Sequence, residues 1–206
     1  FYIFAKLIYN RYKREKVIIM HVKIIENYKP INEQEAIDKK AMLNFIKHNN
    51  DALYRTNLIA HFTSSAIVVN KTKDKVLFIY HLIYKSWSWV GGHNDGEPNF
   101  LKVALTEAFE ETGVKSIRPL LNEPVALDNI NVENHIKNGH YVGDHIHMNI
   151  TYLLEADEEE ETHIKADENS GVKWFLIKDV LKHVDEKRML NIYRKVFDKL
   201  DKLKEL

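Results

Sequence analysis

Three glutamates lie close together near the end of the segment from Phe100 to Gly113, FLKVALTEAFEETG. Apolar residues recur in it at helical spacing, which predicts an amphipathic helix. The apolar stripe consists of Leu101, Ala104, Leu105 and Ala108. Glu107, Glu110 and Glu111 are three and four residues apart, so we expect them to cluster on the opposite side. There they repel one another and oppose the helix dipole, and divalent cations would relieve the repulsion, with oxygen ligands favouring Mg²⁺ or Mn²⁺ over zinc.

A glycine-rich loop, GGHNDG, comes directly before this helix at residues 91–96. It follows a β-rich run. A strand, loop and helix in this order bring backbone groups close to phosphates and allow a carbonyl to point at a metal ion. An acidic helix by itself is more often a solvated surface. The loop makes a site for metal and phosphate the preferred interpretation.

The segment from Gly92 to Val114, GHNDGEPNFLKVALTEAFEETGV, resembles the signature of the Nudix hydrolases, GX5EX7REUXEEXGU, in which U is a bulky aliphatic residue. Gly92 matches the opening glycine, and Glu107 matches the glutamate of the Arg-Glu pair. Glu110 and Glu111 match the paired glutamates. A weaker resemblance extends over about residues 57–175, the extent expected of a Nudix domain.

The resemblance implies metal-assisted hydrolysis of a diphosphate linkage in a small nucleotide-like substrate, typically a nucleoside diphosphate joined to another group. Mg²⁺ or Mn²⁺ would be held by Glu107, Glu110, Glu111 and the carbonyl of Gly92, and would lower the pKa of the attacking water. Glu110 and Glu111 are the catalytic candidates. The proton acceptor is either Glu110 or a carboxylate on a later loop.

Two positions depart from the signature. Thr106 stands at the arginine position and Pro98 at the first glutamate position, with Glu97 one residue early. In the family, those two side chains are thought to brace the loop against the helix, so the helix must be held here in another way. The departures motivate a second hypothesis, a non-hydrolytic Nudix-like module that binds a ligand or regulates.

Further side chains are candidates for substrate binding. His145, His147 and Asn149 alternate with apolar residues, so a strand would place all three on one face. The imidazoles could bind phosphate or transfer protons, with a wet sheet face as the alternative, and a zinc site made from them lacks a clear third ligand. The other substrate-binding candidates are His93, Asp95 and Trp89.

A tryptophan and two polar segments near these candidates could also contribute to the substrate pocket. Trp89 either stacks on a base or is buried, which is the commoner fate of an aromatic side chain. The polar segment 128–144 is typical of a long loop that shapes a substrate pocket. The acidic run 155–168 is typical of a solvated turn, with a carboxylate that reaches the metals as the alternative.

Other elements must position the acidic helix. A helix is predicted from Asn32 to Asn49, with Asn32 and Glu35 as its start signal, and its apolar residues are Ile37, Ala41, Phe45 and Ile46. The β-rich runs 59–69 and 76–84 flank a polar turn and predict a hairpin. Further strands are expected at about 117–121, 124–127, 146–154 and 172–175, and helices in the last forty residues.

This order of elements predicts an α+β fold or an α/β sandwich, with a sheet covered on both faces. With the resemblance, it becomes a Nudix-like α/β/α sandwich with a mixed sheet, an N-terminal helical extension and C-terminal helices. We divide the chain into an N-terminal extension (1–19), a helical segment packed on the domain (20–56) and a Nudix-like domain (57–206). The basic, aromatic residues 1–19 would lie either on a membrane surface or as a simple extension.

Composition excludes several functions. The chain of 206 residues has 30 Lys and Arg against 30 Asp and Glu, so a nucleic acid bound mainly through its phosphates is not expected. It has no cysteine, which excludes thiolate catalysis. Isopentenyl diphosphate isomerisation, which proteins of the resembled fold can also perform but with a cysteine, is therefore the last-ranked of three hypotheses. No run reaches the roughly 18–20 apolar residues of a membrane span. We expect a cytoplasmic protein without stable membrane insertion, and a homodimer is one option.

Overall fold

The computed structural model describes residues 21–137 and 139–204. Predictions for the extension 1–19 therefore lie outside the described residues, as does the first residue of the segment 20–56. Within the described ranges, no helix combines the length and the apolar character needed to cross a membrane.

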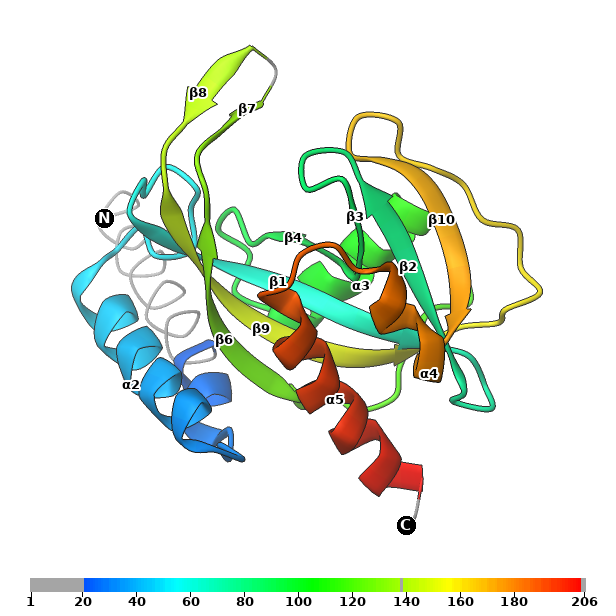
Figure 1. Cartoon of the computed structure of the whole chain (residues 1–206). Helices are drawn as coiled ribbons and strands as arrows, with labels where there is room; N and C mark the ends of the chain where they lie inside the picture. The colour runs from blue at the N-terminus through cyan, green and yellow to red at the C-terminus, as the bar shows by residue number, and fades with distance from the viewer. Residues whose placement is uncertain (1–20, 138, 205–206) are drawn as a thin grey trace, which may run out of the picture.

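An eight-stranded mixed sheet forms the centre of the fold (Figure 1). Its central path runs β10-β2-β1-β9-β5, with β3 paired to β2, β4 to β1 and β6 to β9. The strands are β1 (Ala60–Val69), β2 (Lys75–His81), β3 (Ser86–Ser88), β4 (Val90–His93), β5 (Arg118–Pro119), β6 (Ala126–Val132), β9 (His145–Glu155) and β10 (Asn169–Leu176). The long β1 and β9 pair in parallel, and the other strand pairs of this sheet are antiparallel. The predicted hairpin of β1 and β2 is confirmed.

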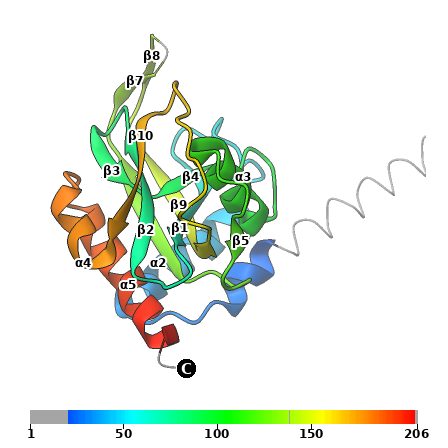
Figure 2. The same ribbon diagram turned by 90° about the vertical axis from the view of Figure 1, so that its right-hand side faces the viewer.

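Helices cover both faces of the sheet, as Figure 2 shows for α3 and α5 on opposite sides. The helices are α2 (Glu33–His48), α3 (Phe100–Thr112), the short α4 (Ile177–Val180) with a 3-10 turn (Leu181–His183), and α5 (Met189–Lys204). Even-numbered residues of β1 and β9, such as Phe62 and Ile150, share a core with α3. Odd-numbered ones, such as Ile67 and Leu153, share a second core with α5. The predicted α+β sandwich is therefore confirmed.

The helix α2 begins where the sequence predicts, because the side chain of Asn32 accepts a hydrogen bond from the amide of Glu35. Its buried face agrees only in part with the expected one: Phe45 and Ile46 pack against the core as predicted. Ile37 is 60% exposed, whereas Glu35 and Met42 are buried. Helical spacing shows which residues of a helix share a side, but it does not show which elements pack against that side. Here α2 directs Glu35 toward a buried ion network.

That network joins α2, β6 and α5 through Lys195. Its ammonium lies 2.6 Å from the carboxylate of Asp128 and 3.1 Å from that of Glu35. Replacing Lys195 by Met leaves two buried carboxyl groups without this cation. Because removing one partner of a buried ion pair costs several kcal/mol, we expect the free energy of unfolding to fall by about 3–5 kcal/mol.

Urea unfolding checks this stability prediction. Lys202→Met is the matched control, because Lys202 is exposed on the same helix and surface substitutions change stability by less than about 0.5 kcal/mol. Equal losses in the two variants would show that the buried network does not hold the three elements together.

The segment 128–144 is not a loop, so that expectation was wrong. Its first part continues β6, which pairs with β9 from Ala126 to Val132. Its second part is a hairpin of β7 (His135–Lys137) and β8 (His140–Val142) that projects from the sheet (Figure 1). The polar residue Asn129 of β6 has a tertiary partner, because the side-chain amide donates to the carboxylate of Asp38 in α2 at 3.0 Å. This hydrogen bond accommodates a polar side chain in a strand whose residues Ala126, Leu127 and Val132 are buried.

Candidate active site

A cavity of about 590 Å³ lies on the sheet face that α5 covers only in part. Along β1 this face begins with His61, Thr63 and Ser65 at the cavity and continues with Ile67 and Val69 under α5. Alternate residues of a strand share a face, so one face is polar at one end and apolar at the other. The polar ends of β1 and β9 together form one wall of the cavity.

The acidic helix α3 forms as the sequence predicts. Asn99 caps its first turn by accepting from the amide of Lys102, and Gly113 ends it with a φ of 74°. A left-handed residue of this kind is most easily a glycine. Both ends of the helix are thereby fixed. The positions of its glutamates then depend on how the helix is rotated about its own axis against the sheet.

The three glutamates do not cluster on the face opposite the apolar stripe, which corrects that prediction. Glu111 is 2% exposed on the buried side of the helix, and Glu107 is half-buried. Both line the cavity. Glu110 is exposed, and its carboxylate lies 3.1 Å from the ammonium of Lys165. The helix therefore presents two carboxylates to the cavity and directs the third toward a lysine.

Both cavity carboxylates lie against the glycine pair of β4. The amide of Gly91 donates to Glu111 at 2.8 Å. A Cβ placed on Gly92 would lie only 2.3 Å from a carboxylate oxygen of Glu107, so only glycine allows this approach. Gly92 thus occupies the place beside the metal-binding candidates that the sequence predicts.

Burial controls the protonation of these two groups. It raises the pKa of Glu107 to about 7, with smaller contributions from neighbouring charges. It also raises the pKa of Glu111 well above the usual range, although the amide of Gly91 acts in the opposite direction. Burying two carboxylates side by side is unfavourable without a cation. The pair therefore fits a hard divalent ion, for which oxygen ligands are suited.

A third carboxylate, Glu168, also lines the cavity. It lies 3.0 Å from Lys165, the same lysine that contacts Glu110. Glu168 is the last residue of the acidic run. Within the run, Glu160 stabilises the turn by accepting from the amides of Lys115 and Ser116. The interpretation as a turn thus fits most of the run, and only its end reaches the site.

The loop and helix are braced without the two signature side chains. Asn94 is buried; it accepts from Ser64 at 3.0 Å and donates to the carbonyl of Glu97 at 2.8 Å. The carboxylate of Glu97 accepts from the amide of Asn99 at 3.1 Å and pairs with Lys102 of α3. Glu97, one residue before the expected position, therefore joins the loop to the start of the helix.

The substrate-binding candidates divide into two groups. His93, Trp89, His145 and His147 line the cavity. Asp95 does not line it but pairs with Arg55, whose guanidinium holds the pKa of Asp95 below its usual value. Arg55 itself lines the cavity and was not singled out from the sequence, because nothing in residues 50–57 indicates contact with a loop forty residues later.

Trp89 is largely buried, at 8% exposure, and packs edge-on against Tyr193 of α5 with ring centroids 5.2 Å apart. Its burial matches the interpretation as a buried aromatic side chain. Because it also lies on the cavity wall, stacking on a base stays a prediction. The aromatic side chain both closes the core and contributes apolar surface to the cavity.

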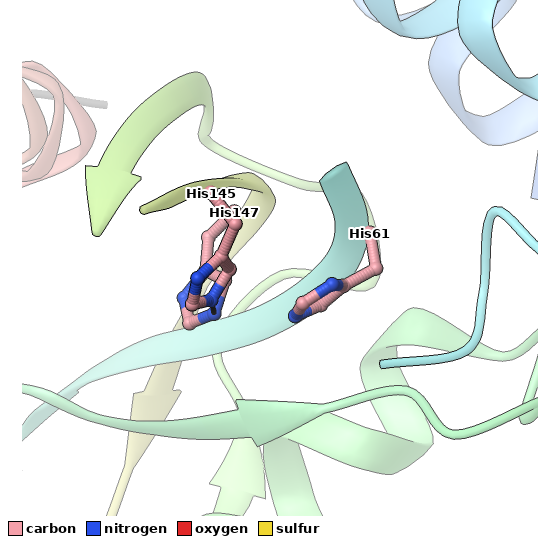
Figure 3. A group of neighbouring side chains, drawn as sticks. All are labelled: His61, His145 and His147. Atoms are coloured by element: carbon pink, nitrogen blue, oxygen red, sulfur yellow. Dashed lines mark hydrogen bonds between the residues drawn. The ribbon is translucent and has the colours of Figure 1, made fainter. Parts of the chain in front are cut away.

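A cluster of imidazoles forms on the cavity wall, and sequence reasoning missed one member. His61 of β1 joins His145 and His147 of β9, and Figure 3 shows the three rings directed toward one another. The ring of His93 lies 5.0 Å from that of His61 and 4.9 Å from that of His147. Burial lowers the pKa of His93 to about 3 and that of His147 well below its usual value, so these rings are neutral.

These features define an α+β protein in which a mixed sheet lies between helices and an acidic helix packs against a glycine pair. The sequence model of the NUDIX domain matches residues 60–199. The chain therefore belongs to the Nudix hydrolase family, whose members generally hydrolyse compounds in which a nucleoside diphosphate is linked to another group.

One solved structure agrees with the fold, and a second is reported for comparison. A hydrolase of the NUDIX family from Clostridium perfringens is 24% identical, with a TM-score of 0.51 over 68% of this chain and 97% of the other. An Ap4A hydrolase from C. elegans is 15% identical, with a TM-score of 0.47 over 68% and 97% of the two chains. No curated protein sequence matches this chain significantly.

Proposed function

We propose that this protein hydrolyses a diphosphate linkage in a small nucleotide-like substrate with the help of Mg²⁺ or Mn²⁺. The observation that carries the proposal is the pair of buried carboxylates, Glu107 and Glu111, placed against Gly91 and Gly92 at a cavity large enough for such a substrate. Ligand pockets in proteins commonly have volumes of about 300–1,000 Å³.

The two buried glutamates would hold the divalent ion, together with the backbone of Gly92. When bound, the ion neutralises charge on the phosphates and activates water. Arg55, at the cavity wall, supplies a cation for a phosphate oxygen. The four cavity-lining candidates Trp89, His93, His145 and His147 are proposed to contact the rest of the substrate.

Of the two possible proton acceptors, the geometry supports Glu168. It lines the cavity, whereas Glu110 is exposed and does not belong to the lining residues. A general base must come within hydrogen-bond reach of the attacking water. Lys165 contacts both carboxylates and thereby positions Glu168 at the cavity edge.

The variants Glu168→Gln and Glu110→Gln separate the two assignments. Loss of a general base typically costs about 10²–10⁴-fold in rate, so we expect kcat of Glu168→Gln to fall at least about 100-fold. For Glu110→Gln we expect a fall of less than about 10-fold, because the neutral side chain loses only its exposed contact with Lys165. Rates at saturating Mg²⁺ check this, and the reverse order would identify Glu110 as the base.

The activity itself is tested by incubating the full chain with a panel of nucleotide-linked diphosphates and Mg²⁺, Mn²⁺ or chelator. We expect turnover of at least one substrate that stops when the metal is removed. Saturable binding of these compounds without turnover would instead establish the non-hydrolytic module that the replacements at Thr106 and Pro98 suggest.

A further inference from the structure

We propose that His61, His145 and His147 form a second metal site, which binds Zn²⁺ or a similar transition-metal ion, on the cavity wall formed by β1 and β9. The proposal goes beyond the hydrolysis proposed above and does not depend on it. It rests on the convergence of three ring nitrogens, on the hydrogen bonds behind the rings and on an unpartnered buried nitrogen.

The sheet itself brings the three rings together. His61 and His147 are direct partners in the parallel pairing of β1 with β9, and His145 lies two residues earlier on the same face. One ring nitrogen of each residue lies within 4.8 Å of the others, as Figure 3 shows. Tetrahedral zinc, with bonds of about 2.0–2.1 Å, holds its nitrogens about 3.4 Å apart. Small side-chain rotations close the remaining difference.

In two of the rings, a hydrogen bond to Nδ1 leaves Nε2 available to bind the metal ion. Nδ1 of His61 lies 3.0 Å from the carbonyl of Asn57, and Nδ1 of His145 lies 2.8 Å from that of Gly143. A carbonyl only accepts, so in both rings Nδ1 carries the hydrogen. The lone pair of a neutral ring is then on Nε2. A backbone carbonyl behind the ring is also the usual support of a metal-binding histidine.

Nε2 of His61 shows the deficit that an ion would fill. It is buried and has no hydrogen-bond partner, in a residue only 3% exposed. Buried polar atoms are nearly always partnered, and an unpartnered one calls for an explanation such as a missing ion. Because Nδ1 of His145 carries its hydrogen, Nε2 of His147 donates to Nε2 of His145 at 3.1 Å. An ion would replace this hydrogen bond once the hydrogen of His147 moves to Nδ1, and would also satisfy His61.

The donor set distinguishes this site from the carboxylate site. Imidazole nitrogens prefer zinc, copper, nickel or cobalt, whereas carboxylates suit Mg²⁺ or Mn²⁺. Three protein ligands leave a coordination position free, as in zinc sites that bind water or a ligand. The rings line the cavity wall, so an ion there would present that position to an anionic or oxygen-donor group of a bound molecule.

Metal titration of the full chain without an affinity tag tests the proposal. The protein is stripped with chelator, supplied with excess Mg²⁺ to occupy carboxylates, and titrated with Zn²⁺ by calorimetry and with Co²⁺ by visible absorption. We expect one Zn²⁺ per chain and the strong bands of tetrahedral Co²⁺. In the double variant His145→Gln/His147→Gln, Zn²⁺ affinity should fall at least about 100-fold, because two of three ligands are lost.

Two matched variants make the result specific. His135→Gln removes a histidine that lines the same cavity and has the same kind of Nδ1 contact with a carbonyl but lies outside the converging group, so it should bind Zn²⁺ as the wild type does. Glu107→Gln/Glu111→Gln should also retain Zn²⁺. The single variant His147→Gln, with its fold checked by circular dichroism, repeats the test if the double variant does not fold.

Absence of Zn²⁺ binding, or binding that the histidine substitutions leave unchanged, would overturn the proposal. Loss of Zn²⁺ in Glu107→Gln/Glu111→Gln would overturn it as well, since the ion would then occupy the carboxylate site. None of these outcomes bears on Mg²⁺-dependent hydrolysis, which is measured separately, so the two proposals fail independently.

Discussion

Glu111→Gln is expected to lower Mg²⁺-dependent hydrolysis by about 10³-fold, equivalent to about 4 kcal/mol of transition-state stabilisation. The substitution preserves the shape and keeps an oxygen that accepts from the amide of Gly91. It removes only the negative charge that would hold the ion. Steady-state rates over a range of Mg²⁺ concentrations measure the effect.

Thermal unfolding shows whether the loss arises at the metal site. Burial raises the pKa of Glu111 well above its usual value, so a neutral glutamine relieves an unfavourable burial. We expect the metal-free variant to melt no lower than the wild type, and Mg²⁺ to stabilise only the wild type. Glu161→Gln, at an exposed position of the acidic turn, is the control and should retain full activity. Full activity of Glu111→Gln would remove the basis of the proposed function.

Gly92→Ala is expected to reduce hydrolysis at least about 100-fold, the second large effect. The new Cβ would lie 2.3 Å from Oε1 of Glu107 and 2.3 Å from its Cδ, and atoms do not approach so closely. The carboxylate must move away, and displacements of about 1 Å at a reacting centre cost about 10²-fold in rate. A rise in the Mg²⁺ concentration needed for half-maximal rate should accompany the loss.

A glycine elsewhere supplies the comparison. A Cβ on Gly139, in the turn between β7 and β8, would meet nothing within 4 Å. Its positive φ of 78° makes alanine there cost about 1–2 kcal/mol of local strain, which lowers the melting temperature slightly. Hydrolysis by Gly139→Ala should remain that of the wild type. Similar rates for both alanine variants would show that Glu107 does not need its position against Gly92.

The acidic helix was predictable from sequence because its signals are local. Apolar spacing and Gly113 give α3 the expected bounds, from Phe100 to Thr112. The same reasoning failed for its glutamates. Repulsion among carboxylates suggested a common solvated side, but the packing of α3 on β1 and β4 turned Glu111 into the interior. The rotation of a helix is decided by what it packs against.

Two other predictions were also correct where local signals decide the structure and wrong where tertiary packing decides it. The helix starting at Asn32 was correct in extent, yet its buried face contains Glu35, whose partner Lys195 lies 160 residues later in α5. The segment 128–144 was expected to be a loop because it is long and polar, but it pairs with β9 and then forms a hairpin. Neither partner is visible within the segment concerned.

The sequence alone determined most of the elements, the family resemblance and the spacing that puts His145 and His147 on one face, because these depend on neighbours within a few residues. Only the tertiary structure decided that Glu110 turns outward, that Glu168 reaches the cavity and that His61 joins the other two imidazoles. Those placements depend on the register of β1 against β9 and on the turn that ends the acidic run 155–168, which brings Glu168 to the cavity. Contacts between residues far apart in the chain are fixed by packing of the whole sheet, which no local pattern records.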